Sequence, residues 1–158
     1  MKNYRIEIKW AIVYVIVSFV WIFIQKALGF FDSNISRHVF FSVLIVLVLI
    51  PLFYFEQTDK KKNFLNNKMM WKQGFISGCL VIVLATLFVP VLSYVTYELV
   101  APDFFKKAIA LYTESGKLNP IDAAARFNLK SSMLQGVSDN LSFGISFSAI
   151  MAFFTKSK

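Results

Sequence analysis

Four apolar stretches, each close to the length of a membrane span, constrain this chain more than any other feature of its sequence. A helix needs about 20 mainly apolar residues to cross a hydrocarbon core about 30 Å thick. The stretches that approach this length cover residues 8–28, 39–55, 73–97 and 133–154. We therefore predict an all-α polytopic membrane protein, with residues 1–158 forming a single membrane domain of four transmembrane helices.

The composition agrees with a membrane protein. Hydrophobic residues make up 57% of the chain and charged residues 16%, compared with about 25% charged residues in soluble domains. The net charge of +8 would suit nucleic acid, but the basic residues lie beside the apolar stretches and no nucleic-acid-binding motif accompanies them. We therefore expect the lipid bilayer, and not nucleic acid, as the partner of this chain.

The first stretch has a second interpretation. Basic residues precede an apolar run over residues 10–24, as in a signal peptide, and residues 27–29 resemble a cleavage site. However, the run reaches the upper length limit of a signal core, and Gln25 and Lys26 interrupt it before the small residues. A first membrane span is the favoured interpretation.

The distribution of Lys and Arg predicts the orientation in the membrane. The loop over residues 59–72 carries five lysines: Lys60, Lys61, Lys62, Lys68 and Lys72. With both termini inside, ten of the 17 basic residues lie on the cytoplasmic side. Because cytoplasmic loops carry an excess of Lys and Arg, we predict that both termini are cytoplasmic.

Helix start and stop signals punctuate residues 102–130, between the third and fourth spans. Pro102 suits a first helical turn, and Gly116 suits a C-terminal cap. Asn119 and Pro120 then suit a second helix start, and this helix is expected to run unbroken into the last span. We predict a helical hairpin on the outer membrane surface. Its apolar face would contact lipid or, alternatively, a docked partner.

The fourth stretch is far more polar than the other three. At about 100° per residue, four of its polar residues share roughly 60° of arc. They are Gln135, Asp139, Ser142 and Ser146, and Gly136, Asn140 and Gly144 form a neighbouring stripe. Polar groups that face hydrocarbon lack hydrogen-bond partners. We therefore expect this helix inside a bundle or at an interface with another copy or a larger membrane complex.

Glycines mark positions where helices can pack closely. Gly74 and Gly78 lie four residues apart in the third span, and Gly136 and Gly144 lie in the fourth. Small residues let two helix backbones approach each other in membranes. These glycines are the predicted helix-packing positions.

Several polar residues are expected at one depth in the outer leaflet. The candidate pocket consists of Asp139, Asn140, Gln135, Arg37, His38 and Glu98. Asp139 lies about 9 Å below the outer end of the last span, and it would titrate when the pocket binds an ion, proton or lipid headgroup. The alternative is structural: Asp139 pairs with Arg37 or His38, or bonds to serines, and fixes the helix register.

The sequence contains no recognisable catalytic or metal-binding motif. His38 is the only histidine and Cys79 the only cysteine, so neither a zinc site nor a disulfide within the chain is expected. A nucleophile elbow, an HExxH motif and a phosphate-binding glycine loop are all missing from the sequence. We predict a protein that is not an enzyme and needs no cofactor.

Several short segments, spread over nearly the whole chain, form a recognisable set. They are Glu7-Ile8-Lys9-Trp10, Trp21, Arg37-His38, Lys61-Lys62-Asn63, Lys72-Gln73-Gly74-Phe75 with Gly78, and Ala101-Pro102-Asp103-Phe104. The set resembles a bacterial family of small four-span membrane proteins classed as a domain of unknown function. This resemblance implies an inner-membrane location and four spans, and it implies no activity and no functional residue.

Two functional hypotheses follow. The first is a non-catalytic integral membrane protein, a packing or assembly subunit of the bacterial inner membrane whose last span contacts its own spans, another copy or a larger partner. The alternative is a small transporter, or a lipid- or ion-binding protein, that uses the polar pocket around Asp139.

Overall fold

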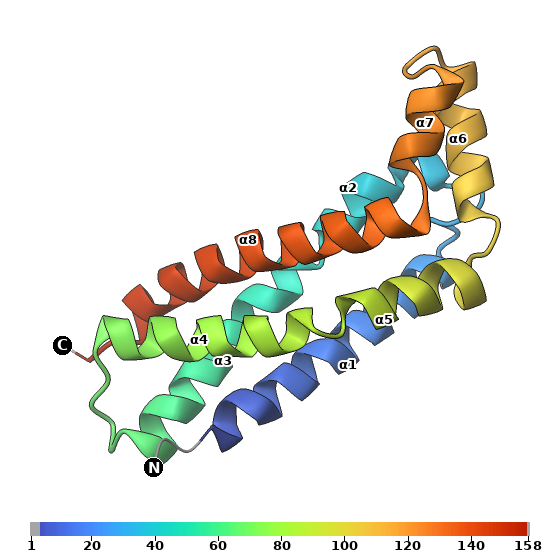
Figure 1. Ribbon diagram of the computed structural model, residues 1–158. Coiled ribbons are helices and arrows are strands. Elements are labelled where there is room, and N and C mark those ends of the chain that lie inside the picture. Colours follow the sequence, from blue (N-terminus) through green and yellow to red (C-terminus); the bar gives the residue numbers. More distant parts are fainter. Residues whose placement is uncertain (1–3, 158) are drawn as a thin grey trace. The chain divides into compact units, whose positions relative to one another are not determined.

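The computed structural model describes residues 4–157, which fold into helices and contain no strand (Figure 1). The predicted all-α class is therefore confirmed for this part of the chain. Lys2 and Lys158, which the topology count includes, lie outside the described residues.

The helices follow one another along the chain with short connections. They are α1 (Arg5–Ala27), the 3₁₀ helix η1 (Ile35–Arg37), α2 (His38–Val43), α3 (Val46–Phe64), α4 (Trp71–Thr86), α5 (Val89–Tyr94), the π-helix η2 (Val95–Val100), α6 (Phe104–Glu114), α7 (Pro120–Arg126) and α8 (Leu129–Thr155).

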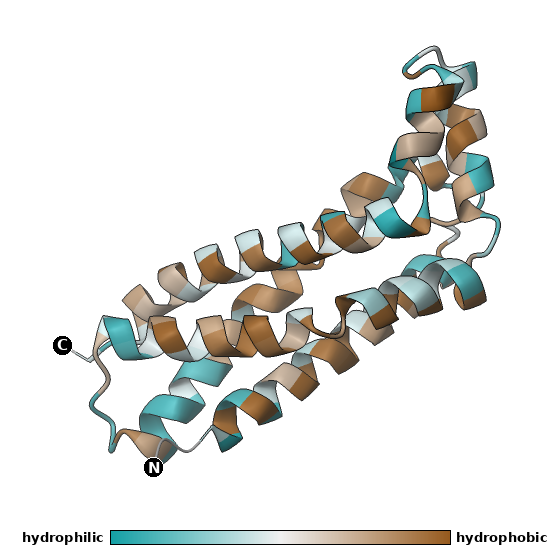
Figure 2. Cartoon of the chain, in the orientation of Figure 1, coloured by the Kyte–Doolittle hydropathy of each residue, from teal (hydrophilic) through white to brown (hydrophobic). Residues whose placement is uncertain are grey.

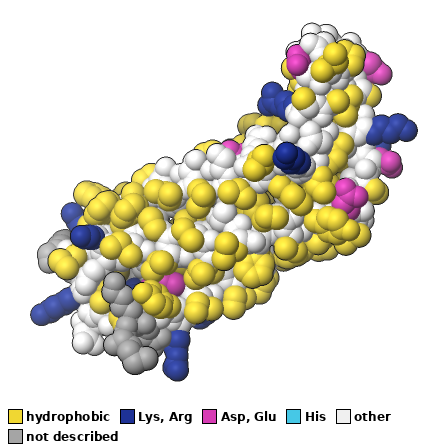
Figure 3. All heavy atoms as spheres, in the orientation of Figure 1, with side chains coloured by type: hydrophobic (Ala, Val, Ile, Leu, Met, Phe, Trp, Pro, Cys, Tyr) yellow, Lys and Arg dark blue, Asp and Glu magenta, His cyan; other side chains and the backbone are white. Residues whose placement is uncertain are grey.

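By length and composition, three helical segments of the described chain can cross a membrane. They are Arg5–Ala27, Ile35–Phe64 and Leu129–Thr155, and a fourth span is added if Trp71–Thr86 and Val89–Val100 count as one broken helix. Hydrophobic residues dominate the long helices in Figure 2, and apolar side chains cover much of their visible surface in Figure 3. These features are those of a membrane protein with three or four spans.

The helices divide between two compact units. Unit 1 comprises Met1–Val17, Val46–Phe88 and Ser138–Lys158, and unit 2 comprises Ser18–Ile45 and Val89–Val137. Each unit buries apolar residues of its own.

Within unit 1, α4 and α8 pack closely against each other. Ile82 is fully buried, and a Cβ added to Gly144 would lie 2.1 Å from its Cγ1 atom. A Cβ added to Gly78 would lie 2.1 Å from the Oγ of Ser148. At Gly74 an added Cβ would lie 3.1 to 3.3 Å from its nearest neighbours. Only glycine leaves room for the opposite helix at Gly78 and Gly144.

Aromatic rings form the core of unit 2. Phe31 and Phe104 meet edge to face with ring centroids 5.6 Å apart, and Ala101 and Ala108 are buried beside them. The ring of Tyr97 packs against Phe104 with a centroid distance of 5.2 Å. Gly136 of α8 also packs in this unit, because an added Cβ would lie 2.9 Å from Val89 Cγ1.

The helix that begins near Asn119 does not continue into α8, and this corrects the sequence-based expectation. The Asn119 side chain caps α7 by accepting a hydrogen bond from the Asp122 amide at 2.8 Å. Asn128 then breaks the helix, because its side-chain amide donates to the carbonyls of Ala124 and Ala125 while its Oδ1 accepts from the Ser131 amide. One side chain therefore ends α7 and begins α8.

An exposed carboxylate connects the loop after α1 to α6 within unit 2. Asp32 accepts hydrogen bonds from Lys107 and, at 3.0 Å, from Lys26. The Lys107 ammonium, followed by that of Lys26, holds the pKa of Asp32 below its ordinary value of 3.8. The same contact raises the pKa of Lys107.

Asp32→Asn should speed amide hydrogen exchange in α6 at neutral pH. A lowered folded-state pKa means that Asp32 stabilises the fold above its unfolded value of 3.8 and loses this effect as the pH falls through the folded value. The difference in exchange between variant and unchanged protein should therefore fade in acid. A difference that stayed the same in acid would contradict a role for the Asp32 charge.

Candidate functional site

A group of charged and polar side chains is buried inside unit 1. It consists of Glu7 on α1, Glu56 and Lys60 on α3, and Ser77 on α4, and we call it the Glu56 cluster. Their exposed fractions are 2%, 0%, 8% and 2%. Buried charges are rare unless they are paired.

Hydrogen bonds and one ion pair connect the four members. The Lys60 Nζ lies 2.7 Å from Glu7 Oε1. The Ser77 Oγ lies 3.1 Å from the same Glu7 oxygen and 2.6 Å from Glu56 Oε1. The other carboxyl oxygens, Oε2 of Glu7 and Oε2 of Glu56, are buried and have no hydrogen-bond partner among the described residues.

Gln57 extends this polar core toward α8. Its Nε2 donates to the Ser148 carbonyl at 3.0 Å, and its Oε1 accepts from the Thr155 hydroxyl at 2.7 Å. The Ser148 hydroxyl in turn donates to the Phe75 carbonyl on α4 at 2.9 Å. Uncharged groups on α8 therefore satisfy the amide that lies beside the Glu56 cluster.

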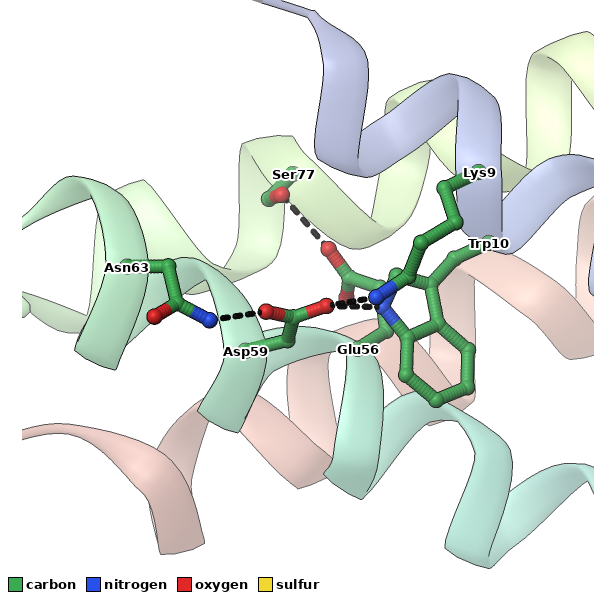
Figure 4. A network of polar contacts seen from close by, with 6 residues as sticks. All are labelled: Lys9, Trp10, Glu56, Asp59, Asn63 and Ser77. Atoms are coloured by element: carbon green, nitrogen blue, oxygen red, sulfur yellow. Dashed lines mark hydrogen bonds and ion pairs between the residues drawn. The ribbon is translucent and has the colours of Figure 1, made fainter.

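Asp59 holds α1 to α3 beside the cluster. Its carboxylate accepts from Lys9, from the Trp10 indole at 2.8 Å and from the Asn63 amide at 2.6 Å. Figure 4 shows Asp59 between Asn63 on one side and Lys9 and Trp10 on the other, with a Glu56 oxygen directed toward Ser77. The Asp59 charge is thus matched by Lys9 and is separate from the buried ion pair.

The Glu56 cluster was not predicted from the sequence. The second span was expected to end at Phe55 and Lys60 to belong to the topology signal, whereas α3 continues to Phe64. Residues four apart lie on one helix face, so the spacing of Glu56 and Lys60 was the available signal. The position of Ser77 beside Gly78 was a second one.

The residues of the predicted polar pocket divide between the two units. In unit 2, His38 lines a cavity of ≈ 170 Å³, and its ring lies 4.7 Å from that of Phe104, centroid to centroid. The same unit contains Arg37, Glu98 and Gln135, which are exposed and do not line this cavity.

Polar groups of unit 2 supply part of the wall of this cavity. They include Gln25, Ser42, Ser93 and Thr96. The Gln25 amide donates to the Ser42 hydroxyl at 2.7 Å, and the Thr96 hydroxyl donates to the Leu92 carbonyl at 2.7 Å. Several of the polar groups that line the cavity therefore already bond to one another or to the backbone.

Asn140 and Asp139 lie in unit 1 and have different surroundings. The Asn140 amide donates to the Thr86 hydroxyl at 2.8 Å, and its oxygen accepts from the Tyr14 hydroxyl. Asp139 is exposed and makes no hydrogen bond or ion pair within the described residues of its unit. Of these two adjacent residues on α8, Asn140 bonds to packed side chains of unit 1 and Asp139 lies on the exposed surface.

No group of three or more His, Cys, Asp or Glu side chains among residues 4–157 is arranged to hold a metal ion. No curated protein and no solved structure matches this chain. Residues 9–157 match the model of a family described as "Protein of unknown function (DUF4199)". This match covers nearly the whole chain and confirms the resemblance to a family of unknown function. The chain belongs to the DUF4199 family.

Proposed function

We propose that this protein is a non-catalytic integral membrane protein of the bacterial inner membrane that serves as an assembly subunit. In this proposal α8 crosses the membrane and presents a polar edge to the helix of another membrane protein. The observation that carries the proposal is the exposure of Asp139, Ser142 and Ser146, which we call the α8 polar edge.

The position of this edge makes lipid an unfavourable neighbour. Ser142 stands at the midpoint of the 27-residue helix, and Asp139 lies one turn away. Ser146 satisfies its hydroxyl by donating to the Ser142 carbonyl at 2.8 Å, but Asp139 makes no hydrogen bond or ion pair with the described residues of unit 1. A carboxylate near the bilayer centre costs about 2.5–3.5 kcal/mol on insertion scales, and a protein partner would remove that cost.

Charge favours a different protein over a second copy as the partner. A second copy that pairs through the same edge would bring another Asp139 and would add no positive charge. A spanning helix with a basic side chain or several hydrogen-bond donors would complement the carboxylate. We therefore commit to a membrane protein of that chemistry as the occupant of the α8 polar edge.

The remaining parts of the proposal concern orientation. The lysine-rich loop between α3 and α4 would lie in the cytoplasm with both termini, as the excess of basic residues favours. Residues 102–130, which contain α6 and α7, would then form a helical hairpin on the outer surface. The alternative, a small transporter or lipid- or ion-binding protein, would use the cavity beside His38 and would require no partner at the α8 polar edge.

A photoreactive benzoylphenylalanine at Ser142 should cross-link to the partner in native membranes. The same group at Ile145 is the matched control, because Ile145 is exposed on α8 but lies about 60° from Ser142 and further from Asp139. We expect an adduct from Ser142 and little from Ile145, and the cross-linked peptide should be a spanning segment with Lys, Arg or His. Asp139→Leu should reduce the adduct.

Two results would contradict this function. An adduct at twice the mass of the chain would assign the α8 polar edge to a second copy. Equal cross-linking to lipid from both positions would show that the edge has no protein partner, and the cavity beside His38 would then become the site to pursue.

A further inference from the structure

The Glu56 cluster contains more negative than positive charge if every group is ionised. Glu7 and Glu56 would carry two negative charges and Lys60 one positive charge. All three are at most 8% exposed, so water does not solvate the excess. An unpaired buried charge is strongly unfavourable. The cluster therefore requires one more positive charge.

The number of hydrogen atoms available for the hydrogen bonds of Ser77 indicates that this positive charge is a proton on Glu56. Ser77 has a single hydroxyl hydrogen, yet its oxygen lies within hydrogen-bond distance of Glu7 Oε1 and Glu56 Oε1. It can donate to only one of them. Glu7 Oε1 also receives a hydrogen bond from Lys60, 2.7 Å away, as expected of the ionised carboxylate. The 2.6 Å contact to Glu56 then needs a hydrogen supplied by Glu56.

Oε2 of Glu7 and Oε2 of Glu56 are both buried without a partner among the described residues, which favours a single ionised acid in the cluster, and the Lys60 contact assigns that charge to Glu7. Oε2 of Glu56 is buried and accepts no hydrogen bond from the described residues. In an ionised carboxylate this oxygen would carry half of a negative charge without a donor, at a desolvation cost above the usual 1–3 kcal/mol of an unsatisfied group. In a neutral acid it is a carbonyl oxygen, for which the cost is much lower.

We propose that Glu56 is a buried proton-binding site, a neutral carboxylic acid that donates its hydrogen to the Ser77 oxygen. Ser77 then donates to the Glu7 carboxylate, which pairs with Lys60. The other titratable groups that act on Glu56 or respond to it are Asp59, which is matched by Lys9, and the Cys79 thiol. The groups of α8 that bond to the neighbouring Gln57 are uncharged. The site is thus electrically neutral with one bound proton.

Infrared spectroscopy of the purified full chain in detergent tests this proposal. At neutral pH exposed carboxyls are ionised, so a carbonyl stretch of a protonated acid reports a buried proton. We expect such a band in the unchanged protein. It should shift when the chain is made with ¹³C-labelled glutamate, which separates Glu56 from Asp139 and the other aspartates. Glu98 and Glu114 are exposed and would not contribute.

Two aspartate variants assign the band to a residue. Glu56→Asp should move the protonated acid to an aspartate, so the band should persist but no longer shift with labelled glutamate, whereas Glu7→Asp should leave the band sensitive to that label.

Three further variants test the charge balance and the hydrogen bond to Ser77. Glu56→Gln should remove the band without unfolding the protein, because the glutamine amide can donate to Ser77 as the acid does. Glu7→Gln should also remove it, although Glu56 is still present, because Glu56 must then ionise to balance Lys60. Ser77→Ala should leave a protonated acid but change the frequency of its band.

Several outcomes would overturn the proposal. The absence of the band in the unchanged protein is one, and a band that ignores the glutamate label there or survives Glu56→Gln is another. If Glu56→Gln failed to fold, Glu56→Asp would still decide the question, because a band that stayed sensitive to the glutamate label in that variant would assign the proton to Glu7. Absence of the band combined with stabilisation by sodium ions would assign the missing positive charge to a metal cation instead.

Discussion

Gly144→Leu is expected to destabilise unit 1 strongly. The first added carbon would lie 2.1, 2.5 and 2.9 Å from three atoms of Ile82, and Ile82 is itself fully buried and cannot move aside. Overpacking a well-filled core costs about 1–3 kcal/mol, occasionally more, and leucine adds further atoms beyond this first carbon. The midpoint of unfolding by dodecyl sulfate in mixed micelles, followed by helical circular dichroism, should fall sharply.

Ser138→Leu is the matched control for this substitution. It adds a leucine to the exposed side of the same helix, two turns earlier, so it should leave the unfolding midpoint nearly unchanged. If both variants lost the same stability, the loss would come from leucine on α8 in general. The close approach of α4 and α8 at Gly144 would then not be a determinant of the fold.

Lys60→Met is expected to be the most destabilising single substitution of a charged residue in the chain. Methionine retains much of the apolar volume of the lysine stem, but it leaves the Glu7 carboxylate buried without its cation. Removing one partner of a buried ion pair costs about 3–5 kcal/mol. The contact between Lys60 and Glu7 is 2.7 Å long, and their side chains are 11% and 2% exposed. The same detergent unfolding experiment measures the effect.

Lys62→Met provides the comparison, since Lys62 lies on the same helix and is exposed. It removes one positive charge from the same lysine-rich segment and should change the unfolding midpoint little. The double variant Glu7→Gln with Lys60→Met should recover part of the stability that Lys60→Met loses, because no unmatched charge remains. A double variant as unstable as the sum of both changes would contradict the ion pair.

The helical class and the apolar spans could be predicted because they depend on local composition. An apolar run near 20 residues long has few alternatives in a chain with 57% hydrophobic residues. The predicted spans over residues 8–28 and 133–154 correspond to α1 and α8 within a few residues. The capping role of Asn119 was also local, because its partner Asp122 is three residues away.

The Glu56 cluster could not be predicted from local patterns. Glu56 and Lys60 follow an apolar run, and in that position charged residues usually mark the end of a span. Their burial depends on Glu7 and Ser77, which the sequence places far away in other helices. No rule of periodicity selects these partners, because several other acidic and hydroxyl residues had similar spacing to an apolar run. The three-dimensional packing of α1, α3 and α4 decides the question.

The break between α7 and α8 could not be predicted from the sequence for a different reason. The expected continuous helix was wrong because Asn128 bonds both to the end of one helix and to the start of the next. Asparagine is tolerated inside helices as well as at their ends. The identity of residue 128 therefore allowed both a continuous helix and a break, and the hydrogen bonds of Asn128 in the folded protein produce the break.

The pairing of Glu7 has a consequence for the order in which the protein is made. Ser77 follows Glu7 by 70 residues, and at about 5–20 residues per second a ribosome needs roughly 4–14 s to synthesise that interval. The hydrogen bond from the Tyr14 hydroxyl to Asn140 forms later still, since Asn140 follows Tyr14 by 126 residues. When α1 leaves the ribosome, the Ser77 hydroxyl and the Asn140 amide that bond its side chains in the folded protein have not yet been made. These contacts of α1 can therefore form only after segments that follow it by 70 to 126 residues have been translated.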